Sequence, residues 1–409
     1  MPRRLVLVAA FLVAASAALA ASVDLPLVHW VATWTAAPVP PGTTFAPAPP
    51  APFDNQTIRH IVRVSAGGWQ VRARFSNAFG RTPLRIGAAH IARHAAGAAI
   101  MPGTDHELTF GGRPAVTVPV GAVVVSDPID LDVPTHGRLA VSLYLPGPTG
   151  PPTYHEVTRQ TSYVSEPGDF TGEVEFPVAR STVSRYFLSV VEVLTRLDVG
   201  TVVAFGDSIT VGAQSTVDAY RTWPDVLSAR LNPYGFPRVA VVNQGVGCGR
   251  LLFDLCGQNG SARFDRDVLA ASGARHVIVA LGLNDIGIPV IINRPSELVS
   301  ADDIIVGLRQ LIERARAQRL RVHGATITPV GSSIFPGFFT PENEAKRQAV
   351  NAWIRTGGEF DSVIDFDAVV RDPAQPTRLR PDFSSPDGVH LSDAGYLAMA
   401  NSIDLLLFR

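Results

Sequence analysis

The sequence predicts two domains of different fold class: an antiparallel β-sandwich or jelly roll, followed by an α/β domain built on a doubly wound parallel sheet. First, residues 31–194 alternate apolar and polar side chains with a period of two, which is typical of half-buried strands. Second, residues 198–409 alternate apolar strands with amphipathic helical patterns. Third, 409 residues exceed the roughly 150 residues of an average domain more than two-fold.

The β-rich region contains three clear alternating stretches, 57–64, 69–75 and 139–145. Turn residues separate the strands, for example Gly67-Gly68 and Gly111-Gly112. The whole chain has 35 glycines and 33 prolines, more than average usage, and this region shows no convincing helical pattern. A β-sandwich or jelly roll is therefore expected here.

The second region contains five apolar runs that predict strands: 200–205, 238–243, 276–281, 321–328 and 363–366. Between these runs, residues 302–318 and 341–356 predict helices. The first helix would place five apolar side chains on one face, those of Ile304, Ile305, Leu308, Leu311 and Ile312. Since ligands of doubly wound sheets bind beyond the carboxyl ends of the strands, functional residues are expected at those ends.

The composition excludes several classes of protein. Hydrophobic residues make up 46% of the chain and charged residues 17%, so there is enough apolar material for buried cores and wholesale disorder is excluded. Lys plus Arg total 35 and Asp plus Glu 36, which gives a net charge of -1. Without an overall field, neither nucleic acid nor an anionic membrane surface is an expected partner.

Residues 1–20 have the three parts of a secretory signal peptide. Arg3 and Arg4 are followed by an apolar run over 5–15 and by the small-residue site Ala18-Leu19-Ala20. We expect cleavage after Ala20 and a secreted or periplasmic protein. A membrane anchor is the alternative, but the run is shorter than the ~20 residues of a bilayer span. No later segment is suited to span, and no stable membrane insertion is expected.

The chain has two cysteines, Cys248 and Cys256. Export would place them in an oxidising compartment, where they can pair. A disulfide between them would close a short loop and act locally. Whether the bond forms stays open from the sequence.

Ser208 follows the first predicted strand of the second region and precedes a predicted helix, in the sequence Gly206-Asp207-Ser208-Ile209. A serine at a strand end is exposed to ligand, and the backbone N–H groups of a following helix can stabilise an oxyanion. Most serines in turns merely cap helices. The functional interpretation therefore needs support from other residues.

That support comes from a second motif near the end of the chain, in which Asp387 precedes His390 by three residues. A nucleophilic serine needs a base within hydrogen-bond reach and an acid that fixes the tautomer of that base. We assign these roles to His390 and Asp387.

Two further segments follow predicted strands. Asn284, in Gly282-Leu283-Asn284-Asp285, offers a side-chain amide as an oxyanion donor, although an ordinary turn asparagine is the alternative. The glycine-rich stretch 243–250 offers backbone N–H groups to the same point.

Together these four segments resemble the SGNH/GDSL hydrolases, which are serine esterases and lipases. The resemblance covers roughly residues 198–409 and implies a flavodoxin-like α/β/α fold. It implies that Ser208 is the nucleophile, His390 the base and Asp387 its orienting acid. Asn284 and the backbone N–H of Ser208 would then stabilise the oxyanion.

The glycine-rich stretch departs from the family pattern. Counting from Asn243, the usual oxyanion glycine falls on Cys248. Because only a backbone N–H is required, Cys248 can still donate, but a shifted register would use Gly247 or Gly249 instead. The donor is left open among these three residues.

Other sites are less well supported. The glycines of 245–249 invite a dinucleotide-binding interpretation, but Arg250 replaces the third fingerprint glycine and no suitable acidic residue follows. His90 and His94 are four residues apart, yet lie in a strand-like pattern without a third ligand. No cofactor and no metal ion are expected.

The expected function is an exported serine esterase that forms an acyl-enzyme. The preceding β-rich domain resembles the arrangement in exported arylesterase-like and acetyl-xylan-esterase-like members, which implies short acyl esters of carbohydrates or of aryl or other small alcohols. A lipase or lysophospholipase of the same family is the alternative. A different class is a carbohydrate-binding protein with an inactive hydrolase domain.

Overall fold

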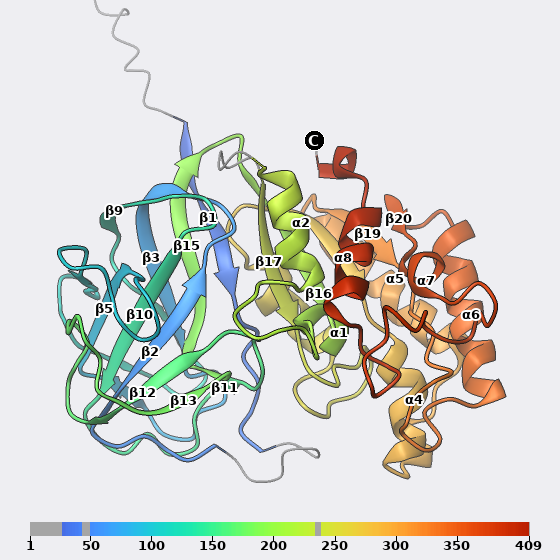
Figure 1. The fold of residues 1–409 in the computed structure, drawn as a ribbon, viewed down its shortest axis with the longest axis horizontal. Coiled ribbons are helices and arrows are strands. Elements are labelled where there is room, and N and C mark those ends of the chain that lie inside the picture. Colours follow the sequence, from blue (N-terminus) through green and yellow to red (C-terminus); the bar gives the residue numbers. More distant parts are fainter. Residues whose placement is uncertain (1–26, 43–49, 234–238, 409) are drawn as a thin grey trace, which may run out of the picture.

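A computed structural model describes residues 27–42, 50–233 and 239–408 (Figure 1). The predicted signal peptide, residues 1–20, and Arg238 of the second predicted strand lie outside these ranges. Within the described ranges, no helix combines the length and apolar character that crossing a bilayer requires.

The first domain is a sandwich of two antiparallel sheets. One sheet has the order β1-β15-β3-β8, with β9 also paired to β3, and the other has the order β13-β12-β2-β10-β5-β6. The strands of the first sheet are β1 (Val28–Thr35), β15 (Leu188–Arg196), β3 (Gly68–Ser76), β8 (Val123–Val125) and β9 (Ile129–Val133). Those of the second are β13 (Val178–Thr182), β12 (Ser162–Pro167), β2 (Gln56–Arg63), β10 (Arg138–Leu145), β5 (Ala88–Arg93) and β6 (His106–Glu107). Two short pairs complete the domain: β4 (Leu84–Ile86) with β7 (Val116–Val118), and β11 (Tyr154–His155) with β14 (Arg185–Tyr186).

The alternating pattern forms this sandwich because every second side chain enters the core. In β3, for example, Val71, Ala73 and Phe75 are fully buried while the residues between them are not. The described part of this domain contains no helix, as the sequence indicates.

The second domain is an α/β/α unit with five parallel strands in the order β17-β16-β18-β19-β20. The strands are β16 (Gly200–Gly206), β17 (Val239–Gly245), β18 (Ala274–Ala280), β19 (Arg321–Ala325) and β20 (Ser362–Ile364). Numbered along the chain, this order is 2-1-3-4-5, the flavodoxin-like doubly wound topology. The predicted fold class is therefore confirmed.

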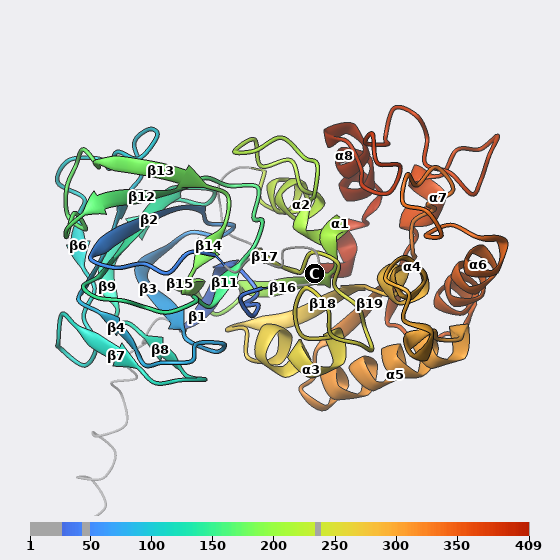
Figure 2. The same cartoon turned by 90° about the horizontal axis from the view of Figure 1, so that it is seen from below.

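Helices cover both faces of this sheet (Figure 2). The group α1 (Ser208–Val211), α2 (Trp223–Leu231) and α8 (Asp393–Ser402) lies on one side, and α3 (Gly260–Phe264) and α5 (Ala301–Ala317) lie on the other. The remaining helices are α4 (Leu283–Ile291), α6 (Pro341–Thr356) and α7 (Phe366–Val370). Because both faces are covered, all seven residues of β16, an interior strand of the sheet, are buried.

The two predicted helices form almost as expected. Helix α5 begins after Ser300, which forms a capping box with Asp303, and its five predicted core residues are all buried. Helix α6 has the predicted bounds because Thr340 caps it and Pro341 occupies its first turn.

Two predicted strands end too late. The run 321–328 forms a strand only to Ala325, and the run 363–366 forms β20, which ends at Ile364. Phe366 already begins α7, where Asp365 caps the helix by accepting from the Ala368 N–H. Apolar residues continue from strand into helix at this point, so the hydrophobic pattern alone does not locate the boundary.

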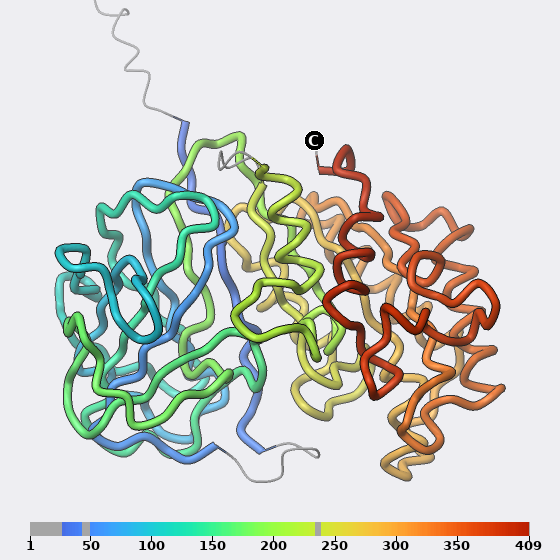
Figure 3. The backbone as a smooth tube through the Cα atoms, in the orientation of Figure 1, coloured from blue at the N-terminus to red at the C-terminus, as the bar shows by residue number. Residues whose placement is uncertain are grey.

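The domains are joined along β1, the edge strand of the first sheet, which packs against β17 of the second domain (Figures 1 and 3). The Thr35 hydroxyl donates to the carbonyl of Asn243 at 2.8 Å, and the Ala32 N–H donates to the carbonyl of Ser272 at 2.9 Å. Ala240 of β17 belongs to the apolar core of the sandwich. The first domain is thus packed directly against the sheet that carries the predicted functional residues.

Candidate active site

Ser208 is the first residue of α1, immediately beyond the carboxyl end of β16. Asp207 caps this helix by accepting from the Ile209 N–H at 2.9 Å. The turn is tight, since a Cβ on Gly206 would lie 2.0 Å from Oγ1 of Thr210. These contacts fix the backbone of Ser208 and leave its hydroxyl at the surface of the sheet end.

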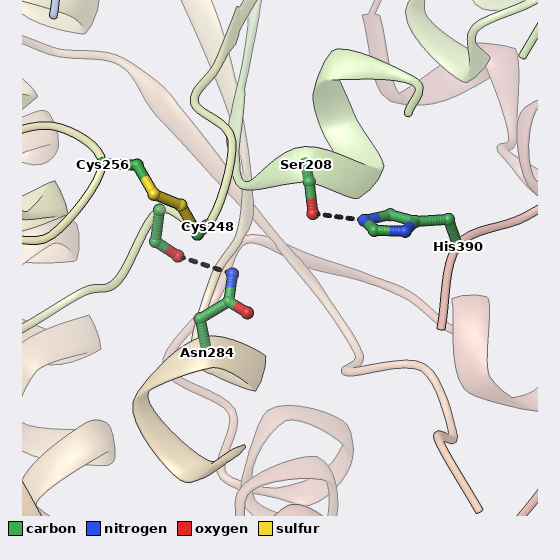
Figure 4. Close-up of a disulfide and its surroundings, with 6 residues drawn as sticks. Ser208, Cys248, Cys256, Asn284 and His390 are labelled. Carbon is green, nitrogen blue, oxygen red and sulfur yellow. Dashed lines mark hydrogen bonds between the residues drawn. A yellow bond between two sulfur atoms is a disulfide. The ribbon is translucent and has the colours of Figure 1, made fainter. Parts of the chain in front are cut away.

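His390 and Asp387 complete a relay with this hydroxyl. The Nε2 atom of His390 lies 2.8 Å from Oγ of Ser208, and its Nδ1 atom lies 2.7 Å from Oδ2 of Asp387. Figure 4 shows the His390 ring pointing at the Ser208 hydroxyl. The structure therefore brings Ser208 to the pair of Asp387 and His390, although Ser208 and His390 are 182 positions apart in the sequence.

The other carboxylate oxygen of Asp387 is fixed by its own loop. Oδ1 accepts from the N–H groups of Val389 at 2.9 Å and His390 at 2.8 Å and from the Ser385 hydroxyl at 2.8 Å. Burial alone would raise the pKa of Asp387, but the hydrogen bonds from His390 outweigh it and hold this pKa well below its ordinary value. Asp387 therefore stays ionised and able to stabilise a protonated His390.

Gly388 allows this loop to turn. Its φ is +69°, and a Cβ at this position would lie 2.0 Å from the carbonyl oxygen of Ser332. Only glycine satisfies both conditions.

The predicted oxyanion residues surround the same space. Asn284 lies at the start of α4, and its Nδ2 donates one hydrogen to the Gly249 carbonyl at 3.0 Å. The second hydrogen of this amide has no partner among the described residues. Figure 4 shows Ser208 at the start of α1, Cys248 in the glycine-rich loop and Asn284 at the start of α4 around one space.

The glycine-rich loop narrows the choice of backbone donor. The Gly249 N–H donates to the Val246 carbonyl at 2.9 Å, so it is already used. In the described part of the chain, the N–H groups of Gly247 and Cys248 have no such acceptor, so these two residues remain as donors. Cys248 has a φ of +44°, an uncommon conformation for a residue other than glycine, and it lines the cavity at Ser208.

Two contacts hold this loop in place. Cys248 and Cys256 form a disulfide. Asp285 accepts from the N–H groups of Leu251 at 2.7 Å and Leu252 at 2.9 Å. The loop is thus anchored on both sides of its turn.

Two buried carboxylates lie next to these groups. Burial raises the pKa of Asp207 to about 6 and that of Asp285 to about 6, although each accepts backbone hydrogen bonds that favour ionisation. Neither touches the Ser208 hydroxyl in a described hydrogen bond. Both act on the loops that carry the site.

Four of the five predicted residues line a cavity of about 430 Å³, to which both domains contribute. Ser208, Cys248, Asn284 and His390 form its floor together with α4, whose Ile288 and Ile291 also line it. Its other residues include Phe335 and Phe338, and the segment 155–159 of the first domain. The sequence did not predict this last contribution, because no local pattern shows which loop of one domain meets the other.

The residues of the alternative sites, a histidine metal pair and a dinucleotide-binding loop, make other contacts in the structure. His90 pairs with Asp105 at 2.7 Å, and His94 lies 2.9 Å from the Gly97 carbonyl, so the two rings serve separate local contacts. Over the described ranges, no group of three or more His, Cys, Asp and Glu residues could hold a metal ion. The glycines at 245–249 belong to the loop beside Ser208 and Asn284.

Comparison with solved structures gives matches that cover about half of this chain. A lipase/acylhydrolase from Enterococcus faecalis has 21% identity over 50% of this chain and 92% of its own, with a TM-score of 0.38. A GDSL-like lipase from Bacteroides thetaiotaomicron has 20% identity over 49% and 84%, with a TM-score of 0.37. A carbohydrate acetylesterase family member from Sinorhizobium meliloti has 17% identity over 51% and 97%, with a TM-score of 0.40. None of the curated proteins matches this chain.

The model of the GDSL-like Lipase/Acylhydrolase family matches residues 204–398. This range begins in β16 and ends in α8, so it contains Ser208, Asn284 and His390. The α/β domain of this chain is therefore a member of the GDSL-like lipase/acylhydrolase family, and the protein is an ester-hydrolysing enzyme.

Proposed function

We propose that the protein is a serine esterase whose nucleophile is Ser208 and whose acid–base group is His390. The observation that carries this proposal is the unbroken relay from Ser208 Oγ through His390 to Asp387, with distances of 2.8 and 2.7 Å. Such a relay lets a serine hydroxyl lose its proton as it attacks a carbonyl carbon.

The reaction has two halves. Ser208 Oγ attacks the ester carbonyl while Nε2 of His390 takes the proton, and the protonated His390 then gives that proton to the leaving alcohol as the acyl-enzyme forms. Water attacks the acyl-enzyme with His390 again as base, and the carboxylic acid leaves as Ser208 regains its proton. Asp387 holds the imidazole in the correct tautomer throughout.

The oxyanion of each tetrahedral intermediate would lie among three N–H donors. These are the backbone N–H of Ser208, the backbone N–H of Cys248 and the side-chain amide of Asn284. Preorganised donors of this kind are worth about 10²–10³-fold in rate each.

We propose short acyl esters, acetyl esters first, of carbohydrates or of aryl or other small alcohols as substrates. The cavity of about 430 Å³ is of a size that takes such small molecules. We further propose export to the periplasm or the medium, on the basis of the signal-like residues 1–20. The Cys248–Cys256 bond suits an oxidising compartment.

A lipase or lysophospholipase is a second candidate, favoured by one observation. Ile334 is 64% exposed and Phe335 40% exposed, and Phe335 lines the cavity. Exposed apolar side chains at the edge of a site are suited to a lipid surface.

Hydrolysis of p-nitrophenyl esters from acetate to palmitate tests these proposals, with the Ser208→Ala and His390→Ala variants alongside. We expect cleavage that favours acetate and is lost in both variants while the fold is kept. Near-normal turnover in either variant would contradict the assigned roles. Acetate release from acetylated xylan, compared with fatty-acid release from lysophospholipid, separates the two substrate classes.

A further inference from the structure

One wall of the catalytic cavity comes from the β-sandwich. His155 at the end of β11, and Glu156, Val157 and Arg159 after it, line the cavity together with Ser208 and His390. The first domain therefore contacts whatever binds at the nucleophile.

This wall is held in place by hydrogen bonds across the domain boundary. The Arg159 guanidinium donates to the carbonyl of Ser215, and the Arg159 carbonyl accepts from the Asp218 N–H at 2.9 Å. The Asp218 carboxylate in turn accepts from the Thr161 N–H at 2.7 Å. A wall fixed in this way can position a bound group instead of merely covering it.

Glu156 is the unusual residue of this wall. It is partly buried, and its carboxylate has neither a hydrogen-bond donor nor a basic partner among the described residues. The other carboxylates around the site all accept N–H groups: Asp207, Asp285 and Asp387. Burial raises the pKa of Glu156, and no hydrogen bond to its carboxylate within the described residues opposes this shift.

The neighbouring side chains indicate what kind of donor is missing. Arg159 and Gln214 also line the cavity, so a carboxylate, a guanidinium and an amide are available there. Arg159 forms no ion pair with Glu156, but its positive charge leaves the cavity wall without a net negative charge, which favours a neutral ligand with several hydroxyl groups over a cation. The apolar side chains of Ile288, Ile291 and Phe338 line the cavity from the α/β domain and suit an acyl group.

We propose that Glu156 is a specificity-determining residue that accepts hydrogen bonds from hydroxyl groups on the alcohol side of the ester. This inference rests on the proposed esterase function and deepens it. The substrate class is an acyl ester of a sugar unit that keeps free hydroxyl groups, and the β-sandwich selects it.

The test compares two acetyl esters on the full mature protein. Monoacetylated methyl xyloside carries hydroxyl groups beside the ester, whereas p-nitrophenyl acetate carries none. In Glu156→Ala we expect kcat/KM to fall roughly ten-fold or more further for the xyloside ester than for p-nitrophenyl acetate, because hydrogen bonds to a charged group are worth about 10–100-fold. Glu156→Gln keeps an acceptor oxygen and should recover part of the loss.

Controls separate the possible outcomes. Glu107→Ala, at an exposed position of β6, should change neither substrate. Equal losses on both esters in Glu156→Ala, or no loss on either, would overturn the inference, and so would a selective loss on acetylcholine, which would indicate a cation site. If p-nitrophenyl acetate is not cleaved in a Ser208-dependent manner, the esterase proposal itself fails, so the two failures are distinguishable.

Discussion

Arg263 donates from Nη2 to the carbonyl oxygen of Gly206 at 2.8 Å, two residues before Ser208. Its Nη1 donates to the carbonyl of Gln244, also at 2.8 Å, at the end of the neighbouring strand. The same guanidinium pairs with Asp267 at 3.0 Å, and both side chains are almost fully buried. One side chain thus joins the strand ends that lead to the nucleophile and to the glycine-rich loop.

Arg263→Met should therefore destabilise the protein by roughly 3–5 kcal/mol, because it leaves two buried carbonyls without donors and removes one partner of Asp267. Urea denaturation measures this change in the free energy of unfolding. The double variant Arg263→Met, Asp267→Leu should recover part of the loss, since it also removes the buried charge. Arg380→Ala, at the exposed pair with Asp382, serves as the control and should have a much smaller effect. If Arg263→Met alone is as stable as the wild type, the strand ends do not depend on this contact.

Asp387→Asn should lower kcat on p-nitrophenyl acetate by about 10³–10⁴-fold. An asparagine amide facing Nδ1 of His390 favours the tautomer whose Nε2 carries the proton, and this nitrogen cannot then accept the proton of Ser208. Asp382→Asn, at an exposed carboxylate, is the matched control and should keep full activity.

The low pKa of Asp387 also affects how kcat/KM depends on pH. Because the pKa of Asp387 lies well below its ordinary value, it does not gain a proton at moderately acidic pH. Asp387 should therefore contribute no step of its own to the acid-side fall in kcat/KM on p-nitrophenyl acetate. An acid-side step that disappears in Asp387→Asn would contradict this account.

Much of the fold follows from local patterns. The strand β16 is predicted because a buried strand of a covered parallel sheet is continuously apolar, and α6 because Thr340 and Pro341 mark its start. Ser208 and Asn284 are predicted to lie together because the carboxyl ends of parallel strands meet at one edge.

Other features depend on contacts that no local pattern records. Arg263 gives no sign in the sequence that it binds two strand ends, since its partners are backbone carbonyls. Glu156 lies in an irregular segment of the first domain, and contacts between the two domains bring that segment to the cavity. The end of β20 was misplaced because Phe366 continues the apolar run into a helix.

Asp207→Asn should change how stability depends on pH. The pKa of Asp207 is raised to about 6 by burial, above the ~3.9 of an unfolded chain. As pH rises from about 4 to about 6, the unfolded state loses this proton first, so the contribution of Asp207 to stability falls over that window. Asparagine cannot ionise and still accepts from the Ile209 N–H through its side-chain oxygen.

The variant should thus be more stable than wild type at pH 7, by on the order of 2–3 kcal/mol, with the difference shrinking toward pH 4. Urea denaturation at both pH values measures it, with Asp302→Asn at an exposed position of α5 as control. A stability difference that does not vary with pH would show that Asp207 is not the titrating group.

Cys256→Ser tests the disulfide that holds the glycine-rich loop. Its loss should lower the free energy of unfolding by about 2–3 kcal/mol, as expected for a short closed loop. It should also lower kcat by roughly ten-fold with little change in KM, because the Cys248 N–H is needed most in the transition state and the loop that carries it becomes looser. Cys256 supplies no oxyanion donor itself, so the effect on kcat reports the constraint on Cys248. Treatment of the wild-type protein with a thiol reductant should reproduce the loss, and the Cys256→Ser variant should be insensitive to it. Full activity in the variant would mean that Asp285, through its bonds to Leu251 and Leu252, holds the loop without help from the disulfide.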